Sequence, residues 1–329
     1  MINKNTLFIL GAGASKPYGY PSGADLRRMI VQQYEGLLLN LVQIKGSFDE
    51  EDLQIILENL KFFLPEFDRA DAFIDLFLSR RPEFERLGKI GIILSILAAE
   101  MDSKFREDMH GKNYQLNWYS YLFPKLTEDM SEPLSYKKFS ENNINFVTFN
   151  YDRSLEYYLS IGMAANFNLR ANQIRDIFDK MQFEHVYGKI DNLPWQQGNT
   201  SLSYQKSGQK INMQQLNSLI KNIYLIQDRK TIDKKRIANL IQKSSRIYFL
   251  GFSYLKENMD VIDIINNTDT QKHIIYGTGY GFKESEINAI VDNYFYTFKR
   301  DDISNSRIKN KKLNILPIDS LELLKEFPL

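Results

Sequence analysis

The chain has 329 residues, a formal net charge of +1 and no cysteine. The absence of cysteine excludes disulfides, thiolate zinc sites and a cysteine nucleophile, and the near-zero charge gives no overall attraction to nucleic acid or anionic membranes. With 43% hydrophobic and 25% charged residues, the composition is that of a globular protein. No charged-then-apolar signal pattern opens the chain, and the most apolar helix candidate, residues 90–99, is far shorter than the roughly 20 residues of a membrane span. We therefore expect a cytoplasmic protein without a membrane segment.

Short apolar runs predict β-strands that alternate with helices along the chain. The predicted strands are Thr6–Leu10, 144–149, 183–186, 246–250, 273–276 and 313–316. Between the first two strands, apolar residues recur at helical spacing over residues 26–41, 53–64 and 84–101, with breaks expected at Pro65 and Pro82. This pattern predicts an α/β fold with a Rossmann-like, doubly wound parallel sheet and a helical insertion module. We expect the sheet domain to comprise residues 1–24 and 140–329, and the insertion to comprise residues 25–139.

A glycine-rich turn follows the first strand, where residues 11–15 are Gly-Ala-Gly-Ala-Ser. Such a turn lets the backbone approach a phosphate, and the next helix offers free N–H groups. Ser15 is a candidate donor to a phosphate oxygen, and Pro21 lies in a loop extension that can close over a ligand. A tight structural turn is the alternative explanation. The Gly-Lys-Ser/Thr ending of a P-loop is absent, so phosphoryl transfer from ATP is not expected.

Polar side chains follow three later strands. Asn150 and Asp152 stand at i and i+2 after the second main strand, where an amide can hold a water or a ribose hydroxyl and a carboxylate can accept from an amide. His185 ends another strand and can act as a general base. Gly251 and Ser253 follow a fourth strand, suited to contacting the adenosine half of a dinucleotide. Each has a structural alternative: a helix cap, a core histidine and an ordinary strand-to-helix turn, respectively.

Taken in order, Gly-Ala-Gly-Ala-Ser, Phe-Asn-Tyr-Asp, His-x-x-Gly-Lys and Gly-Phe-Ser resemble the motifs of the sirtuin superfamily. The resemblance is closer to its bacterial sirtuin-like branch in antiphage defence. It implies an NAD site in which NAD is the substrate and no metal takes part. The implied cofactor-binding residues are Gly11, Ala12, Gly13, Ser15, Pro21, Gly251 and Ser253.

The resemblance also implies an activity, the hydrolysis of NAD to nicotinamide and ADP-ribose. It puts Asp152 on the nicotinamide carboxamide, Asn150 on the water and the ribose, and His185 on the ribose hydroxyls as a base. The implied role is that of an antiviral effector that depletes NAD in abortive infection. The resemblance further implies a homo-oligomer and a separate sensor subunit, such as a HerA-type ATPase, a short argonaute or a nucleotide-processing protein.

Departures from the family keep two alternatives open. The four-cysteine zinc module of deacylating sirtuins is absent, residues 22–24 are Ser-Gly-Ala where the family has Asp-Phe-Arg, and the acyl-lysine-binding strand has no recognisable counterpart. A sirtuin-type deacylase or ADP-ribosyltransferase is one alternative. A non-catalytic regulatory subunit that binds NAD or ADP-ribose is the other.

Overall fold

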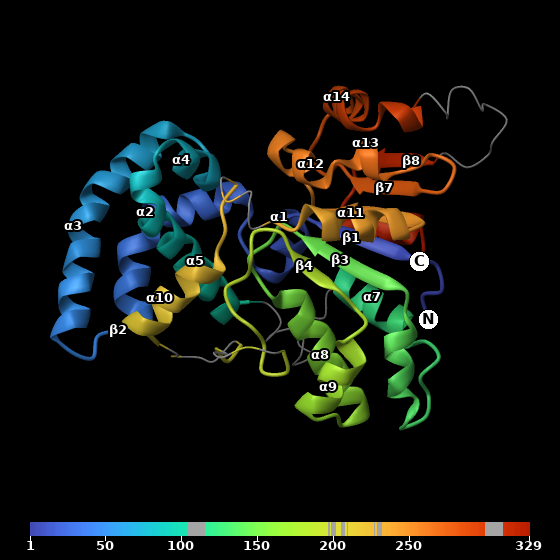
Figure 1. Ribbon diagram of the computed structural model, residues 1–329, viewed down its shortest axis with the longest axis horizontal. Coiled ribbons are helices and arrows are strands. Elements are labelled where there is room, and N and C mark those ends of the chain that lie inside the picture. The colour runs from blue at the N-terminus through green and yellow to red at the C-terminus, as the bar shows by residue number, and fades with distance from the viewer. Residues whose placement is uncertain are drawn as a thin grey trace.

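A six-stranded parallel sheet forms the centre of the protein (Figure 1). The computed structural model describes residues 1–103, 116–196, 198, 202–204, 208, 210–226, 228, 232–299 and 312–329. The strand order is β4-β3-β1-β6-β7-β8, and each neighbouring pair is parallel. The strands are β1 (Thr6–Leu10), β3 (Ile144–Thr148), β4 (Phe183–His185), β6 (Arg246–Leu250), β7 (Ile274–Thr278) and β8 (Leu313–Leu316). The predicted α/β class with a Rossmann-like sheet is confirmed.

An aromatic ladder crosses one face of this sheet. Phe8 of β1 is in register with Phe146 of β3 and Tyr248 of β6, and their ring centroids lie 5.5 and 5.2 Å from that of Phe8. The ladder continues at 4.9 Å from Phe146 to Phe183 and at 4.8 Å from Tyr248 to Tyr276. Stacked aromatic rings bury large apolar areas, so this ladder fixes the register in which the strand ends meet.

Helices flank the sheet and build a separate lobe. The helices that follow the strands or cover the sheet are α1 (Ala12–Ser15), α7 (Trp118–Thr127), α8 (Ser154–Phe167), α9 (Ala171–Phe178), α11 (Lys234–Lys243), α12 (Lys256–Ile262), α13 (Ile264–Asn267), α14 (Glu284–Tyr294) and α16 (Ser320–Glu326). Short 3₁₀ turns occupy Lys16–Tyr18, Pro82–Phe84 and Ser135–Glu141.

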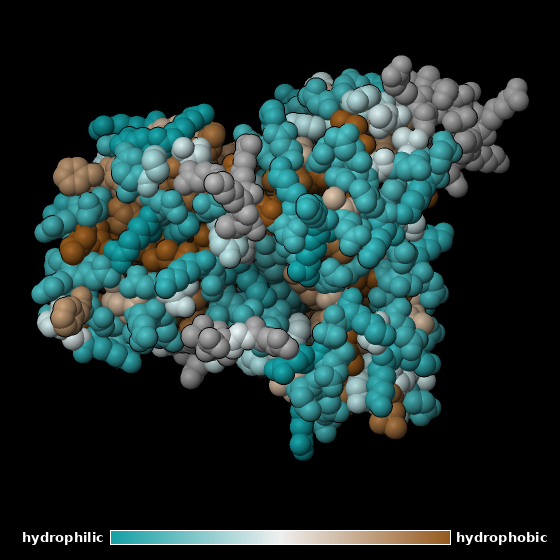
Figure 2. Space-filling model, in the orientation of Figure 1, coloured by the Kyte–Doolittle hydropathy of each residue, from teal (hydrophilic) through white to brown (hydrophobic). Residues whose placement is uncertain are grey.

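The helical lobe, on the left of Figure 1, contains α2 (Gly23–Leu41), α3 (Ser47–Ala70), α4 (Ile74–Arg80), α5 (Glu85–Met101) and α10 (Met213–Asn222). A two-stranded parallel sheet of β2 (Val42–Gln43) and β5 (Ile211–Asn212) joins the early and late parts of the lobe. Every residue from 87 to 97 in α5 is buried, so this helix is the lobe's core. Hydrophobic residues are visible between the lobe's helices in Figure 2, whereas hydrophilic residues cover most of the remaining face.

Two details differ from a simple reading of the sequence pattern. The break expected at Pro65 is wrong, because Pro65 lies inside α3, where Phe63 and Phe67 on either side of it are fully buried against the lobe. Their packing outweighs the hydrogen bond that a helical proline forfeits. In addition, Trp118 of α7 packs near Phe8 and donates from Nε1 to the Ala14 carbonyl, so α7 packs on the sheet rather than in the lobe.

The strand order changes direction beside β1. The chain proceeds from β1 outward to β3 and β4, then returns to β6 on the other side of β1. Loops that leave the carboxyl ends of strands at such a switch point diverge, and ligands of open α/β sheets bind there. A ligand site is therefore expected at the loops that follow β1 and β6.

Candidate functional site

A cavity of about 430 Å³ lies where the strand-end loops face the helical lobe. This volume is in the range of small-molecule sites. The predicted site residues that line it are Gly11, Ala12, Gly13, Pro21, Asn150, Asp152, Gly251 and Ser253. Ser15 and His185 are not among its lining residues. The topology thus brings together residues from three distant parts of the chain.

Glycines allow the turns that follow β1 and β6 to pack closely against each other. The amides of Gly11 and Gly13 donate to the carbonyls of Leu250 and Gly251, at 3.0 Å in both cases. A Cβ on Gly13 would lie 2.8 Å from the Gly251 Cα and carbonyl oxygen, and Gly251 itself has φ +56°. Close backbone approach therefore requires glycine here. The Gly11 and Gly13 amides already have backbone partners, so a bound phosphate would need other donors.

Asn150 has one unsatisfied atom. Its Nδ2 donates to the Gly11 carbonyl and to the Ser15 hydroxyl, at 3.0 Å in both cases. A carbonyl oxygen only accepts, so this bond fixes which end of the amide is nitrogen. Asn150 is 8% exposed, and its buried Oδ1 has no hydrogen-bond partner in the described part of the chain. An unpaired buried acceptor on a cavity wall is costly unless a ligand or water fills it.

Ser15 lies behind Asn150 and holds its side-chain amide through a hydrogen bond. It is 3% exposed, and its hydroxyl accepts from Asn150 Nδ2. The structure thus places this serine under the cavity wall, where it orients the amide.

Asp152 lines the cavity and accepts hydrogen bonds from the first residue of a helix. Its Oδ1 accepts from the Ser154 amide at 3.0 Å and from the Ser154 hydroxyl at the start of α8. Burial raises the pKa of Asp152, although the bonds from Ser154 oppose that change. The N-cap residue of α8 is Arg153, so Asp152 is not the helix cap, although it binds the first residue of that helix from the cavity wall.

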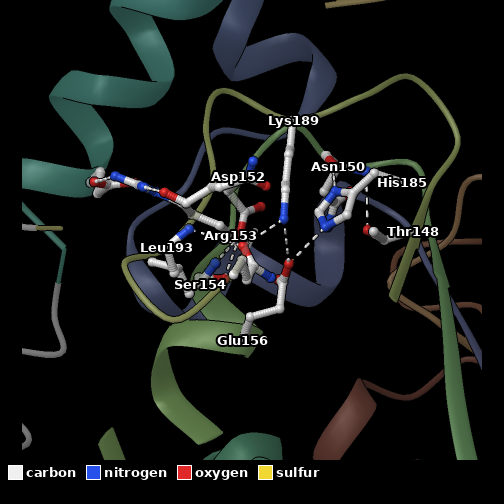
Figure 3. Close-up of polar contacts among 12 residues, drawn as sticks. Thr148, Asn150, Asp152, Arg153, Ser154, Glu156, His185, Lys189 and Leu193 are labelled. Carbon is white, nitrogen blue, oxygen red and sulfur yellow. Dashed lines mark hydrogen bonds and ion pairs between the residues drawn. The ribbon is translucent and has the colours of Figure 1, made fainter. Parts of the chain in front are cut away.

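His185 lies behind Asn150, and both ring nitrogens have partners. Its Nδ1 is 3.1 Å from the Asn150 carbonyl oxygen, and its Nε2 is 2.9 Å from the Glu156 carboxylate (Figure 3). Burial alone would raise the pKa of Glu156, but His185 and then Lys189 outweigh burial and lower it to about 2. Both partners present acceptor oxygens, so a ring nitrogen of His185 that carries a hydrogen can donate to the one that it faces.

Lys189 shares the same carboxylate. Its Nζ lies 3.5 Å from Glu156 and donates to Gln196 at 2.7 Å. Burial lowers the pKa of Lys189, with Glu156 opposing that change. Figure 3 shows that His185, at the end of β4, and Lys189, in the loop that follows, both point at Glu156. This buried cluster holds the backbone of Asn150 in place.

A second buried ion pair joins the helical lobe to the sheet. Arg153, which is completely buried, donates from Nε and Nη2 to the two oxygens of Glu100 on α5, at 3.1 and 2.8 Å. Its Nη1 donates to the Asn192 carbonyl at 2.7 Å. Bidentate arginine–carboxylate geometry is directional, so the end of α5 is held beside the cavity's polar wall.

Tyr187, Tyr151 and Asp75 are among the lining residues that were not identified from the sequence. Tyr187 lies within the His-x-x-Gly-Lys motif and donates to Asn258 Oδ1 at 2.8 Å. Tyr151 separates Asn150 from Asp152, and its hydroxyl lies 3.1 Å from Asp75 Oδ1. Asp75 comes from α4 of the lobe, within a helical pattern that gives no motif signal.

No family model matches the chain, and no curated protein matches it either. Within the described ranges, no helix is long and apolar enough to cross a membrane. Over the same residues, no group of three or more metal-ligating side chains is present.

Proposed function

We propose that the protein is an NAD glycohydrolase that cleaves NAD to nicotinamide and ADP-ribose. One observation carries the proposal: Asn150 lines the cavity, and its buried Oδ1 has no hydrogen-bond partner among the residues that the structure describes. This atom can accept a hydrogen bond from a ribose hydroxyl or from an attacking water, the two groups that the reaction must position. The order of motifs and the position of the cavity at the switch point of the sheet add support.

The chemistry is a substitution at the anomeric carbon. The bond from C1′ to the pyridinium nitrogen breaks, and its electron pair neutralises the nicotinamide ring. The resulting ribosyl cation is captured by water, which forms the C1′–O bond and releases one proton. The protein's contribution is to hold the dinucleotide and the water in line and to stabilise the cation.

The proposed roles of the residues follow from their contacts. Asn150 orients the water and the ribose through Oδ1. Asp152 accepts from the nicotinamide carboxamide with the capacity that Ser154 leaves free. His185 acts as a positioning residue, because it contacts the Asn150 carbonyl and has no free ring nitrogen to serve as a base. Proton release then goes to solvent rather than to His185.

In the cell, we place this activity in the cytoplasm, in antiphage defence by NAD depletion. An enzyme that destroys NAD must be restrained until it is needed. We propose control by homo-oligomer assembly or by a separate subunit, of which a HerA-type ATPase, a short argonaute and a nucleotide-processing protein are candidates.

One observation favours a second function. His185 is held between two acceptors and lies outside the cavity lining, an arrangement that binding alone also explains. The second candidate is therefore a non-catalytic module that binds NAD or ADP-ribose and regulates a partner.

The test is nicotinamide release from NAD, measured by chromatography over a range of protein concentrations. Asn150→Ala should lower the rate by about 10²–10³-fold, the usual effect of removing one preorganised polar group. Asn59→Ala, on the exposed face of α3, is the matched control and should keep the wild-type rate. Thermal unfolding should confirm that both variants fold.

Three outcomes separate the candidates. Release that depends on Asn150 supports the glycohydrolase. Binding of NAD or ADP-ribose without release, at any concentration and with candidate partners added, supports the regulatory module. Wild-type release by a folded Asn150→Ala variant would sink the proposed site.

A further inference from the structure

Asp75 is the charged residue that the helical lobe places in the cavity. The other lining residues from the helices of the lobe carry no charge: Gly23, Leu26, Ile74, Leu76 and Ile96, with Phe73 directly before α4. A carboxylate among apolar neighbours costs desolvation free energy. Burial accordingly raises the pKa of Asp75 to about 6, so the group is ionised at neutral pH despite that cost. A ligand group that pairs with it offsets the cost.

The contacts of Asp75 leave room for a ligand. The Tyr151 hydroxyl, with a single hydrogen, lies 3.1 Å from Asp75 Oδ1 and 3.2 Å from the Tyr224 carbonyl. An ionised carboxylate has about four acceptor positions, so the shared hydroxyl and the bond from the backbone amide of Asp75 itself do not saturate it. Tyr151 follows Asn150 in the chain, and Asp75, Asn150 and Asp152 line the same cavity.

All the charged residues in the lining of the cavity are acidic. Asp75, Asp152 and Glu257 line it, and no lysine, arginine or histidine is among the lining residues in the described ranges. Carboxylates in a partly desolvated site favour a cation and disfavour additional negative charge. NAD carries its one positive charge on the pyridinium ring, and bond cleavage transfers positive charge to the ribose.

We propose that Asp75 pairs with the positive charge of the substrate, so that the cavity selects the oxidised, pyridinium form of the dinucleotide over the reduced form. This inference rests on the proposed function, since it assumes that a nicotinamide dinucleotide occupies the cavity. The helical lobe then supplies a specificity-determining residue to a site built mainly by the sheet.

The test compares two ligands that differ in the charge of the ring. The probes are carba-NAD⁺, whose carbocyclic sugar resists cleavage, and its reduced form carba-NADH, each titrated by calorimetry against the wild-type protein. We expect the oxidised form to bind about tenfold more tightly, a difference of ~1.4 kcal/mol. Asp75→Asn, which keeps the size of the side chain, should bring the two affinities within about twofold of each other.

Two further variants complete the experiment. Asp75→Glu restores the charge and should restore most of the preference. Asp71→Asn removes a carboxylate four residues away that is 90% exposed, in a left-handed conformation that asparagine tolerates. Its preference should equal that of the wild-type protein.

The outcomes are distinguishable from failure of the proposed function. A wild-type protein that binds both probes equally overturns the inference without recourse to any variant, and so does a folded Asp75→Asn protein that keeps the full preference. In both cases dinucleotide binding leaves the proposed function standing. If neither probe binds, the nicotinamide dinucleotide premise fails, and the inference fails with it.

Discussion

Nε2 of His185 lies 2.9 Å from the carboxylate of Glu156, and the two side chains are 7% and 3% exposed. Nδ1 of the same imidazole lies 3.1 Å from the backbone carbonyl oxygen of Asn150, so the pair lies directly behind the Asn150 backbone. The pair therefore contributes to the free energy of unfolding, and it also holds a residue of the candidate site in position.

Glu156→Gln should destabilise the protein strongly at neutral pH, because it leaves His185 and Lys189 without their shared anion. Breaking a buried pair costs about 3–5 kcal/mol. The pKa of Glu156 is lowered in the folded state from 4.5 to about 2, so its stabilisation is present above pH 4.5 and is lost as the pH falls toward 2. Urea unfolding from pH 7 to pH 3 should show the wild-type advantage shrinking over that window.

Glu58→Gln, on the exposed surface of α3, is the control and should leave the unfolding midpoint nearly unchanged at each pH. A difference between wild type and Glu156→Gln that stays constant down to pH 3 would contradict this role of the pair.

Gly13→Ala should destabilise the protein by about 1–3 kcal/mol, the usual cost of overpacking. The added methyl group would meet the backbone of Gly251 at 2.8 Å, and neither turn can move without breaking the bonds between them. Gly36→Ala is the matched substitution, because nothing lies within 4 Å of its Cβ position in α2. It should stabilise the protein by up to about 1 kcal/mol, so equal effects at both positions would refute the argument.

Glu100→Gln and Arg153→Met should each cost about 3–5 kcal/mol, since each leaves a buried charge without its partner. The double variant should cost clearly less than the two together. Chemical denaturation of the four proteins measures this coupling, and simple additivity would show that the pair does not act as a unit. Asp260→Asn, which breaks the surface pair with Lys256, should barely move the midpoint.

The sheet was largely predictable from the sequence because its strands are short apolar runs bounded by turn residues. The predicted bounds of β1, β6 and β8 coincide with the observed ones. The carboxyl ends of parallel strands meet at one edge of a sheet. For this reason the sequence also predicted that Gly11, Asn150 and Gly251 share one cavity, although they are far apart in the chain.

The remaining features depend on tertiary contacts that no local pattern encodes. Asp75 looks like any polar residue in a helix, and only the packing of the lobe brings it to Tyr151. The partners of His185 are Glu156 on α8 and a backbone carbonyl, which strand periodicity does not reveal. Pro65 was misjudged because its neighbours' burial decides the helix, not its own propensity.

The bond from Tyr151 to Asp75 crosses from the sheet to the helical lobe, and the pair of Arg153 and Glu100 makes a second crossing. A molecule in the cavity touches both bodies, so its binding free energy includes the free energy of holding them in this relative position. Thermodynamic reciprocity then requires that, if a ligand in the cavity strengthens the binding of a second protein to the lobe by some factor, that protein strengthens ligand binding by the same factor. Under the proposed function, the outer surface of the lobe would then be a place from which a partner controls ligand binding in the cavity.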